Sequence, residues 1–402
     1  MSRLRRVLVW VIVIGTVVFI AAWVGLKTYL NSSHVRQMAS TQLSDIIGLP
    51  VQVDELSVGG ASTTAALRIP DSEGSDDLLR IGSLNTDITL SGLISGNFAP
   101  TTVTLDRVEF LLRLDADGQI LSPLPKLKEA GSTSGKAVPV VHLTNGRVRI
   151  QQAGKPEFVV SGVSGHLNPA GEGYALTGDI ADPAWGKWTI SGRFAADPAD
   201  GQVVLATEQT EYKDALLHTI PYVPPVVWEH ISASGPTAAA VTFTFRPGAD
   251  LGYAVDLKPR RATLTIPDAD VTVTQVEGRI LVADGKVTVT DGSVALADGR
   301  VAVSGVYTFD QPTAVIAMKL DANGVDVQRL PATWGLPKDI TGKLRGDADL
   351  ELLISPEGKL DTRGTGQGVI EGAKFAGLDA EIKLKLSPQN GRFRFNTNPA
   401  NP

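Results

Sequence analysis

Beyond Pro50, hydrophobic and polar residues alternate with a period of two, which is typical of β-strands whose successive side chains point to opposite faces of a sheet. The clearest stretch covers residues 268–309, where Asp-Gly pairs recur every seven residues at 284–285, 291–292 and 298–299. Asp-Gly suits two-residue hairpin turns, because both central positions adopt positive φ. The pattern therefore predicts a long antiparallel meander of short strands.

Similar turn signals divide the rest of the chain. They are Asp117-Gly118, Asn145-Gly146, Asp200-Gly201, Asn323-Gly324 and Asn390-Gly391. In and around the 268–309 stretch, aliphatic residues at alternate positions of each strand are expected to share one face of the sheet. These candidates for an apolar lining are Val271, Val273, Val287, Val289, Val294, Leu296, Val301 and Val303.

Before Pro50 the hydrophobic period is that of a helix. Apolar residues recur at helical spacing between Val35 and Ile47, and Ser32 or Ser33 can cap the start. Gly48 and Pro50 provide the stop. This predicts one amphipathic helix, lying on a membrane surface, packed against the first strands, or both.

Residues 7–26 are twenty consecutive uncharged and mostly apolar positions, preceded by three arginines. At about 1.5 Å per residue such a helix spans a hydrocarbon core roughly 30 Å thick. The basic residues favour a cytoplasmic N-terminus, which places the chain from about Lys27 onward outside the cytoplasm. The expected anchor residues are Arg3, Arg5, Arg6, Val7, Trp10, Phe19, Trp23 and Leu26. A cleaved signal peptide is the alternative, but the run is long for one and has no convincing cleavage site.

Composition removes several classes of function. The chain has no cysteine, so it forms neither disulfides nor thiolate metal sites. Its formal net charge is -6 with both signs scattered, and no basic stripe predicts binding of nucleic acid. The five histidines form no pair at metal-ligand spacing in the sequence. We expect no metal and no cofactor.

Motifs for catalysis are also weak. Ser164 lies in GVSGH, which lacks the nucleophile elbow, and Gly342-Lys343 does not continue into a phosphate loop. The pairs Asp268/Asp270 and Asp347/Asp349 do not match a calcium loop. Trp185 and Trp188 are interpreted as a core or sheet-edge pair. The sequence therefore predicts that the protein is not an enzyme.

A sheet with a continuous aliphatic face must bury that face against something. Beyond the anchor the chain offers only the helix between Val35 and Ile47 and a short helical interruption near 210–231, where three prolines prevent a continuous helix. The alternatives are a self-packed sandwich, a closed barrel, or a trough filled by an apolar ligand. Periodicity alone favours the sandwich or the barrel.

A resemblance changes that balance. The segments that carry it are the helix end and strand entry I-G-x-P-V at 47–51, the positions Ile81, Leu84, Leu90 and Gly92, the acidic-Gly turn at 117–118, and the later stretches 329–352 and 363–378. In this order they resemble the AsmA-like family. The likeness covers most of the chain, is strongest in the first 120 residues and rests on loose patterns of apolar and glycine positions.

The resemblance implies an all-β fold with an N-terminal transmembrane helix and an elongated antiparallel sheet curled into a groove. The expected segments are the basic end and anchor at 1–27, a helix plus β unit at 28–125, a flexible linker at 126–138 and the groove region at 139–402. It also implies an inner-membrane protein, mostly periplasmic, that transfers phospholipid between membranes or maintains the outer membrane. The expected partners are phospholipid acyl chains, the inner membrane, and an outer-membrane or periplasmic protein.

Two other classes stay open. One is a structural or assembly factor for outer-membrane proteins that acts by strand addition at a sheet edge or by tethering. The other is an enzyme on a membrane tether, for which no residue pair stands out in the sequence.

Overall fold

The computed structural model describes residues 33–47, 49–59, 62–71, 76–89, 100–123, 139–171, 173–195, 200–223, 225–247, 252–267, 270–308, 313–334, 336, 339–355, 360–375, 377–379, 382–389 and 392–399. They belong to two compact units, Met1–Ile180 and Ala181–Pro402. Each unit is described on its own. Strands dominate both, which confirms the all-β prediction.

The first unit begins with the helix predicted from the sequence and continues as a sheet. Its elements are α2 (Ser33–Ile47), β1 (Gln52–Val58), β2 (Thr63–Pro70), β3 (Asp77–Thr86), β4 (Thr102–Leu114), β5 (Val140–Gln152), β6 (Phe158–Ala170) and β7 (Gly173–Asp182). Each strand pairs with the next along the chain, from β1 to β7. The meander is therefore built from neighbours in sequence.

One pairing in this unit departs from the predicted antiparallel meander. β4 and β5 run parallel, with Thr102 in register with Val140 and Leu114 with Gln152. The Asp117-Gly118 turn forms as predicted, but the reversal beyond it extends only to a single bridge between Leu114 and Ile120. A parallel pair needs a crossover connection that returns to the starting end of the strand. The predicted linker at 126–138 falls in that connection and lies outside the described residues.

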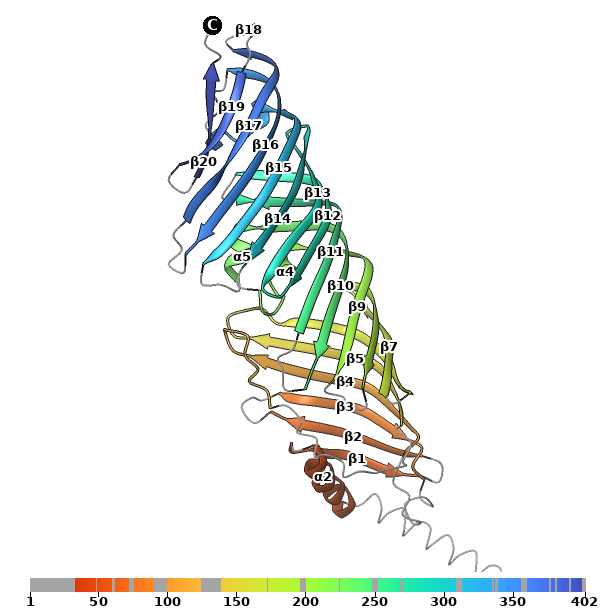
Figure 1. Cartoon of the computed structure of the whole chain (residues 1–402). Helices are drawn as coiled ribbons and strands as arrows, with labels where there is room; N and C mark the ends of the chain where they lie inside the picture. Colours follow the sequence, from red (N-terminus) through yellow and green to blue (C-terminus); the bar gives the residue numbers. More distant parts are fainter. Residues whose placement is uncertain are drawn as a thin grey trace, which may run out of the picture. The chain divides into compact units, whose positions relative to one another are not determined.

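Helix α2 lies along the outer edge of β1 (Figure 1). The Ser40 hydroxyl accepts a hydrogen bond from the Val53 N–H at 3.0 Å, and the Ser44 hydroxyl accepts one from the Val51 N–H at 2.8 Å. The Arg36 guanidinium donates to the Asp54 carbonyl at 2.8 Å. An apolar cluster beside this edge consists of Val51, Ile69 and Leu78, with Leu43, Leu49 and Leu79 packed on it. Of the two expected positions for the helix, the structure places it against the first strands.

The second unit is a longer ladder of strands (Figure 1). Its elements are β8 (Gly186–Phe194), β9 (Gly201–Tyr212), α4 (Asp214–Leu217), α5 (Pro225–His230), β10 (Ser232–Phe245), β11 (Gly252–Ile266), β12 (Val271–Ala283), β13 (Lys286–Leu296), β14 (Gly299–Thr308), β15 (Ala314–Asp326), η2 (Val327–Arg329), η3 (Ala332–Trp334), β16 (Ile340–Ile354), β17 (Leu360–Phe375), β18 (Leu378–Asp379), β19 (Ile382–Gln389) and β20 (Arg392–Pro399). The two short helices lie within the predicted interruption near 210–231, and α5 begins at a proline.

All strand pairs of this second ladder are antiparallel. Consecutive strands pair from β8 to β17, β17 then pairs with both β18 and β19, and β19 pairs with β20. The strands are long, from 8 to 16 residues except β18. These strands continue through several of the turn signals seen in the sequence, because β-bulges form at those positions.

Several of the predicted turns are bulges inside strands. Asp284-Gly285 and Ala297-Asp298 form hairpin turns, but Asp291-Gly292 lies within β13, and the registers shift there. Asn145-Gly146 and Asn323-Gly324 are likewise inside β5 and β15. Positive φ suits a bulge as well as a hairpin turn, with φ of 51° at Asp291 and 52° at Asn145. Asn390-Gly391 lies outside the described residues.

Bulges occur side by side in β10 to β13. The registers shift at Ser234–Thr237, around Arg261, around Gln275 and at Asp291 on successive strands. At this line the backbones approach closely, since a Cβ on Gly278 would lie 2.8 Å from the Gly292 Cα. A bulge bends its strand and increases the local twist. The ladder therefore bends along this line without interrupting its strands.

All eight predicted anchor residues, from Arg3 to Leu26, lie outside the described residues. Within the part of the chain that the structure describes, no helix has the length and apolar character needed to cross a membrane.

Candidate functional site

The eight aliphatic candidates all face the same side of the second unit. Val287 lies opposite Val282 on β12 and opposite Tyr307 on β14, and Val294 lies opposite Val301. Residues directly opposite in an antiparallel pair point to the same face. The bulge at Asp291 adds one residue, so Val287 and Val289 before it share a face with Val294 and Leu296 after it. We call this the apolar face.

Register extends the apolar face over neighbouring strands. The further members are Val203, Leu205, Val241, Val255, Leu257, Ile280, Val282, Ile316, Met318, Leu320, Leu350 and Leu352. Val271 and Val273 belong to it through Ile266 and Leu264, which lie opposite them on β11. The face thus runs in register across strands from β9 to β16.

Most of the apolar face is only half-buried. Val255, Val282, Val289 and Ile316 keep intermediate exposure, whereas the inner face of a β-sandwich is packed at the density of a protein interior. Leu350, at 6% exposure, is one of the few buried members. A half-buried aliphatic row leaves apolar surface available to another molecule.

The opposite face mixes charged and polar side chains with scattered aliphatic ones such as Leu281 and Val306. Asp256 and Arg279 form a bidentate pair on it, with both N···O distances 3.0 Å. Lys319 lies 3.7 Å from Asp349, and both side chains are well exposed. Exposed ion pairs of this kind contribute little to stability. These charges interrupt the apolar residues of this face, whereas the apolar face is aliphatic on every strand from β9 to β16.

One end of the apolar face is covered by the chain itself. After β15, η2 and η3 turn over the ends of the strands, and their side chains join a buried cluster that we call the strand-end cluster. It consists of Val301, Val325, Val327, Leu330, Ile340, Leu344, Ile370, Ala373, Ile382 and Leu384, with Val294, Leu296, Val303 and Trp334 among the residues packed against it. Val325 is 1% exposed. Of the eight candidates, Val301, Val294, Leu296 and Val303 therefore contact core residues.

A cleft of about 120 Å³ opens beside the strand-end cluster. It is lined by Leu296, Val301, Leu320, Ala322, Val325, Leu330, Trp334, Leu344, Gly346, Asp347, Ala348, Gln367, Gly368, Leu384 and Leu386. A cavity of roughly 150 Å³ lined by aliphatic side chains is enough for one benzene molecule. The cleft is therefore large enough for a short piece of an alkyl chain and too small to hold a lipid headgroup as well.

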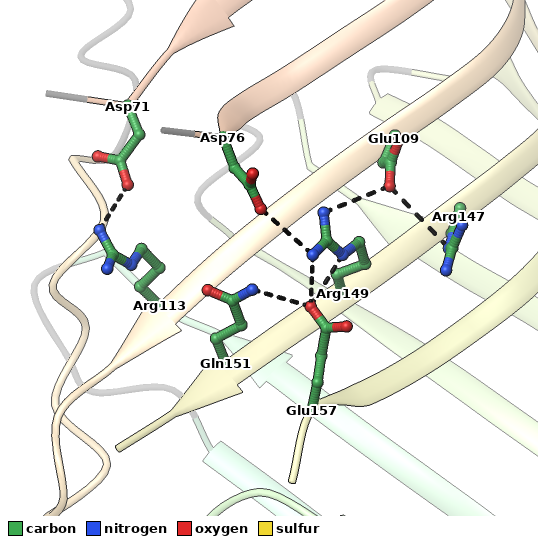
Figure 2. A network of polar contacts seen from close by, with 8 residues as sticks. All are labelled: Asp71, Asp76, Glu109, Arg113, Arg147, Arg149, Gln151 and Glu157. Atoms are coloured by element: carbon green, nitrogen blue, oxygen red, sulfur yellow. Dashed lines mark hydrogen bonds and ion pairs between the residues drawn. The ribbon is translucent and has the colours of Figure 1, made fainter. Parts of the chain in front are cut away.

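A network of charged side chains crosses the first unit (Figure 2). Arg149 on β5 lies 2.8 Å from Glu157, 3.3 Å from Asp76 and 3.6 Å from Glu109. Gln151 donates a hydrogen bond to the same Glu157 oxygen at 3.0 Å. Beside it, Arg113 pairs at 2.7 Å with Asp71, whose side chain is 3% exposed.

The network joins β5 to groups at the start of β3, on β4 and before β6. Burial lowers the pKa of Arg149, but the hydrogen bond that its guanidinium donates to Glu157 and the charges of the three carboxylates outweigh it and raise that pKa above its ordinary value. Each carboxylate is already engaged with a guanidinium, and the described residues contain no group of three or more histidine, aspartate or glutamate side chains able to hold a metal. We interpret the network as structural.

The motifs weighed for catalysis are dispersed over the sheet. Ser164 is a residue of β6, and Gly342-Lys343 lies in β16, where Lys343 pairs with Asp326 at 3.2 Å. Trp185 is buried in the turn after β7, and its carbonyl accepts hydrogen bonds from the Trp188 indole and the Thr210 hydroxyl, both at 2.8 Å. This agrees with the interpretation of the two tryptophans as a core pair. Asp268 lies outside the described residues.

Sequence reasoning missed two groupings. His142 and His166 lie directly opposite each other on β5 and β6, although they are 24 residues apart in the sequence. The Arg149 network also joins residues from four separate segments. The alternation of the charged residues Arg147 and Arg149 with the polar Gln151 was the one available signal for the second grouping.

A scan against protein-family models, a search of curated proteins and a search of solved structures each found no match for this chain. The fold and the candidate site define an all-β protein with an amphipathic antiparallel sheet in its second unit.

Proposed function

We propose that this chain is a membrane-anchored periplasmic protein whose apolar face receives phospholipid acyl chains, for lipid transfer between membranes or for maintenance of the outer membrane. Residues 7–26 form the anchor in this proposal, with the N-terminus in the cytoplasm. The resemblance to the AsmA-like family belongs to the same proposal, as does a sheet that curls into a groove.

One observation carries the proposal: a half-buried aliphatic row that continues in register from β9 to β16. Exposing an acyl chain to water costs about 0.8 kcal/mol per CH₂ group. A continuous apolar surface lowers that cost at every step along the sheet. The process requires no covalent chemistry and no cofactor from the protein.

The charged opposite face supports the same assignment. Lipid tails bind where apolar surface is continuous, and the ion pairs of Asp256–Arg279 and Lys319–Asp349 interrupt the aliphatic residues on that side. The strand-end cluster closes the apolar face at η2 and η3. Acyl chains are therefore expected on the part of the face formed by Val255, Val282, Val289 and Ile316.

Photo-crosslinking in cells tests the proposal. A photoreactive residue at Val289 should capture phospholipid, detected by mass spectrometry of the purified full-length chain. The same residue at Ser304, on the opposite face of the adjacent strand, should capture none. Capture of protein only at Val289, or equal lipid capture at both positions, would refute the assignment.

A substitution pair separates function from folding. With the photoreactive residue at Val282 on the same face, Val289→Asp should abolish lipid capture, while Thr290→Asp, the next residue on the opposite face, should preserve it. Circular dichroism establishes that both variants fold. If Val289→Asp captures lipid as well as the natural chain, the apolar face is not the binding surface.

Strand addition is a second candidate. Within the described residues, β20 has β19 as its ladder partner, which leaves its other edge for a strand from another protein. A proline at Asn396 should then abolish complex formation more strongly than Val289→Asp. The opposite ranking would favour lipid transfer.

A further inference from the structure

His142 on β5 and His166 on β6 form a pair on the polar side of the first unit. They lie directly opposite each other in the antiparallel register, and their ring centroids are 4.8 Å apart at an interplanar angle of 78°. The two Nδ1 atoms face each other at 2.5 Å. The aliphatic neighbours Val141 and Leu143 point to the other side of β5.

This geometry leaves room for only one hydrogen between the two rings. If both Nδ1 atoms carried hydrogens, two N–H groups would point at each other. The pair must therefore share one proton, or both nitrogens must offer lone pairs to a common cation. Imidazole nitrogens are ligands for divalent transition metals.

We propose that His142 and His166 chelate one divalent transition-metal ion through their Nδ1 atoms, with Cu²⁺ favoured. Metal–nitrogen bonds of about 2.0 Å at 90° place two ligand nitrogens roughly 2.8 Å apart, and tetrahedral angles place them roughly 3.3 Å apart. The two Nδ1 atoms are close enough to reach either arrangement, and Cu²⁺ is favoured because it binds nitrogen ligands most tightly among the divalent first-row metals. Small rotations of the side chains supply the difference.

The surroundings fit a shallow site completed by water. His166 is exposed and His142 half-buried, so an ion reaches the ring nitrogens from solvent. Thr104 on β4 is in register with His142, and Thr177 on β7 with His166, so hydroxyl groups flank the pair on both sides. Among the described residues no third histidine, aspartate or glutamate joins the pair. The two rings are therefore the protein ligands, and the metal links β5 to β6.

Titration of the full-length chain in detergent with CuCl₂ tests the inference, followed by electron paramagnetic resonance. The natural chain should bind one equivalent with hyperfine splitting from two nitrogens. His142→Phe keeps the ring shape without a lone pair, and His166→Asn changes an exposed position. Each should weaken binding by more than about tenfold, the smallest loss typical of removing even an outer-shell partner of a metal ligand.

His218→Ala is the matched control, because His218 follows α4 in the second unit and pairs with Asp214. It should leave the Cu²⁺ titration unchanged. Adding ZnCl₂ or CuCl₂ should also raise the thermal midpoint of the natural chain, because an ion that binds only the folded state stabilises it. The double variant His142→Phe/His166→Asn should show no such rise. Absence of Cu²⁺ binding by the natural chain, or equal binding by the double variant, would overturn the inference.

Discussion

The Ser40 hydroxyl on α2 accepts a hydrogen bond from the Val53 N–H on β1, across 3.0 Å. With the Ser44–Val51 hydrogen bond it engages two backbone N–H groups, one on β1 and one just before it, that would otherwise lack a partner on this side. Exposed donors on an edge strand are a template for pairing with another chain. A short polar face of one helix thus blocks strand addition at this edge of the first unit.

Replacing both serines by alanine should loosen that edge. Val51 is 4% exposed, so its N–H would lose its partner in a buried position, and each lost hydrogen bond should destabilise the unit by about 1 kcal/mol. Hydrogen exchange at Val51 and Val53 should accelerate. Thr41→Ala is the control, because its exposed hydroxyl donates only within the helix, to Gln37; comparable acceleration there would contradict the capping role.

Leu344 is 8% exposed in the strand-end cluster, so Leu344→Ala removes buried methyl groups. The free energy of unfolding should fall by about 2–5 kcal/mol, measured by urea denaturation. Val306→Ala is the matched aliphatic control at 39% exposure and should change it by less than about 0.5 kcal/mol. Equal effects would mean that the cluster does not stabilise the second unit.

Arg149 engages three carboxylates, so Arg149→Ala leaves Asp76, Glu109 and Glu157 close together without their shared cation. The expected loss is about 1.5–3 kcal/mol, the range for hydrogen bonds to charged groups, and it should shrink in high salt. Arg147 is 50% exposed and 4.0 Å from Glu109, so Arg147→Ala should cost less than about 1 kcal/mol. Denaturation of both variants at two salt concentrations measures the difference, and a salt-independent loss would argue against an electrostatic origin.

Asp87 closes the loop between β3 and β4 by accepting hydrogen bonds from the Thr101 and Thr102 amides and the Thr101 hydroxyl. The Thr101 hydroxyl, aided by these amides, outweighs burial and holds the pKa of Asp87 below its ordinary value. The unfolded-state pKa is about 3.9, so the stabilisation is complete above that pH and is lost as the pH falls through the lower folded-state pKa.

Asp87→Asn should therefore reduce the urea midpoint near pH 7, and the difference from the natural chain should diminish in strong acid. Asp117→Asn, in the Asp115–Gly118 turn, is a control on an exposed aspartate. A difference that stays constant across the acid range would show that the Asp87 charge is not involved.

Gly278 lies where two bulged strands approach, with φ of 132°. A Cβ there would lie 2.8 Å from the Gly292 Cα, so Gly278→Ala should destabilise the second unit by about 1–3 kcal/mol or more. At Gly252 a Cβ would meet Thr244 at an ordinary 3.5 Å, and Gly252→Ala should be tolerated. The thermal midpoints of the two variants measure the difference. Equal midpoints would show that close backbone approach at the bulges does not require glycine at position 278.

Alternation of aliphatic and polar residues was sufficient to predict β-structure and the common face of Val287, Val289, Val294 and Val301, but it divided β13 into two strands at Asp291-Gly292. It succeeded even across Asp291, because the added residue of the bulge restores the side-chain parity. The helix at 33–47 was equally readable from its period and its stop signals. These features depend on local sequence and on burial of one face.

Other features depend on partners that local patterns do not identify. Asp-Gly at 284–285 makes a turn and Asp-Gly at 291–292 a bulge, since the same φ preference serves both and only strand pairing decides between them. The parallel pairing of β4 with β5 and the encounter of His142 with His166 arise from long-range register. The contribution of η2 and η3 to the strand-end cluster was missed, because their apolar residues Val327, Leu330 and Trp334 do not alternate with polar residues as in a strand.

The parallel register of β4 and β5 also governs how the first unit assembles. The β1–β2 and β2–β3 hairpins close over short loops, whereas Thr102 on β4 meets Val140 on β5 only after a long connection. Closing a longer loop adds only about 0.6 kcal/mol per doubling of its length, but such non-local contacts slow the search for the native topology. During synthesis, β1 to β4 can pair before β5 leaves the ribosome, so the parallel pairing of β4 with β5 forms after the hairpins that precede it.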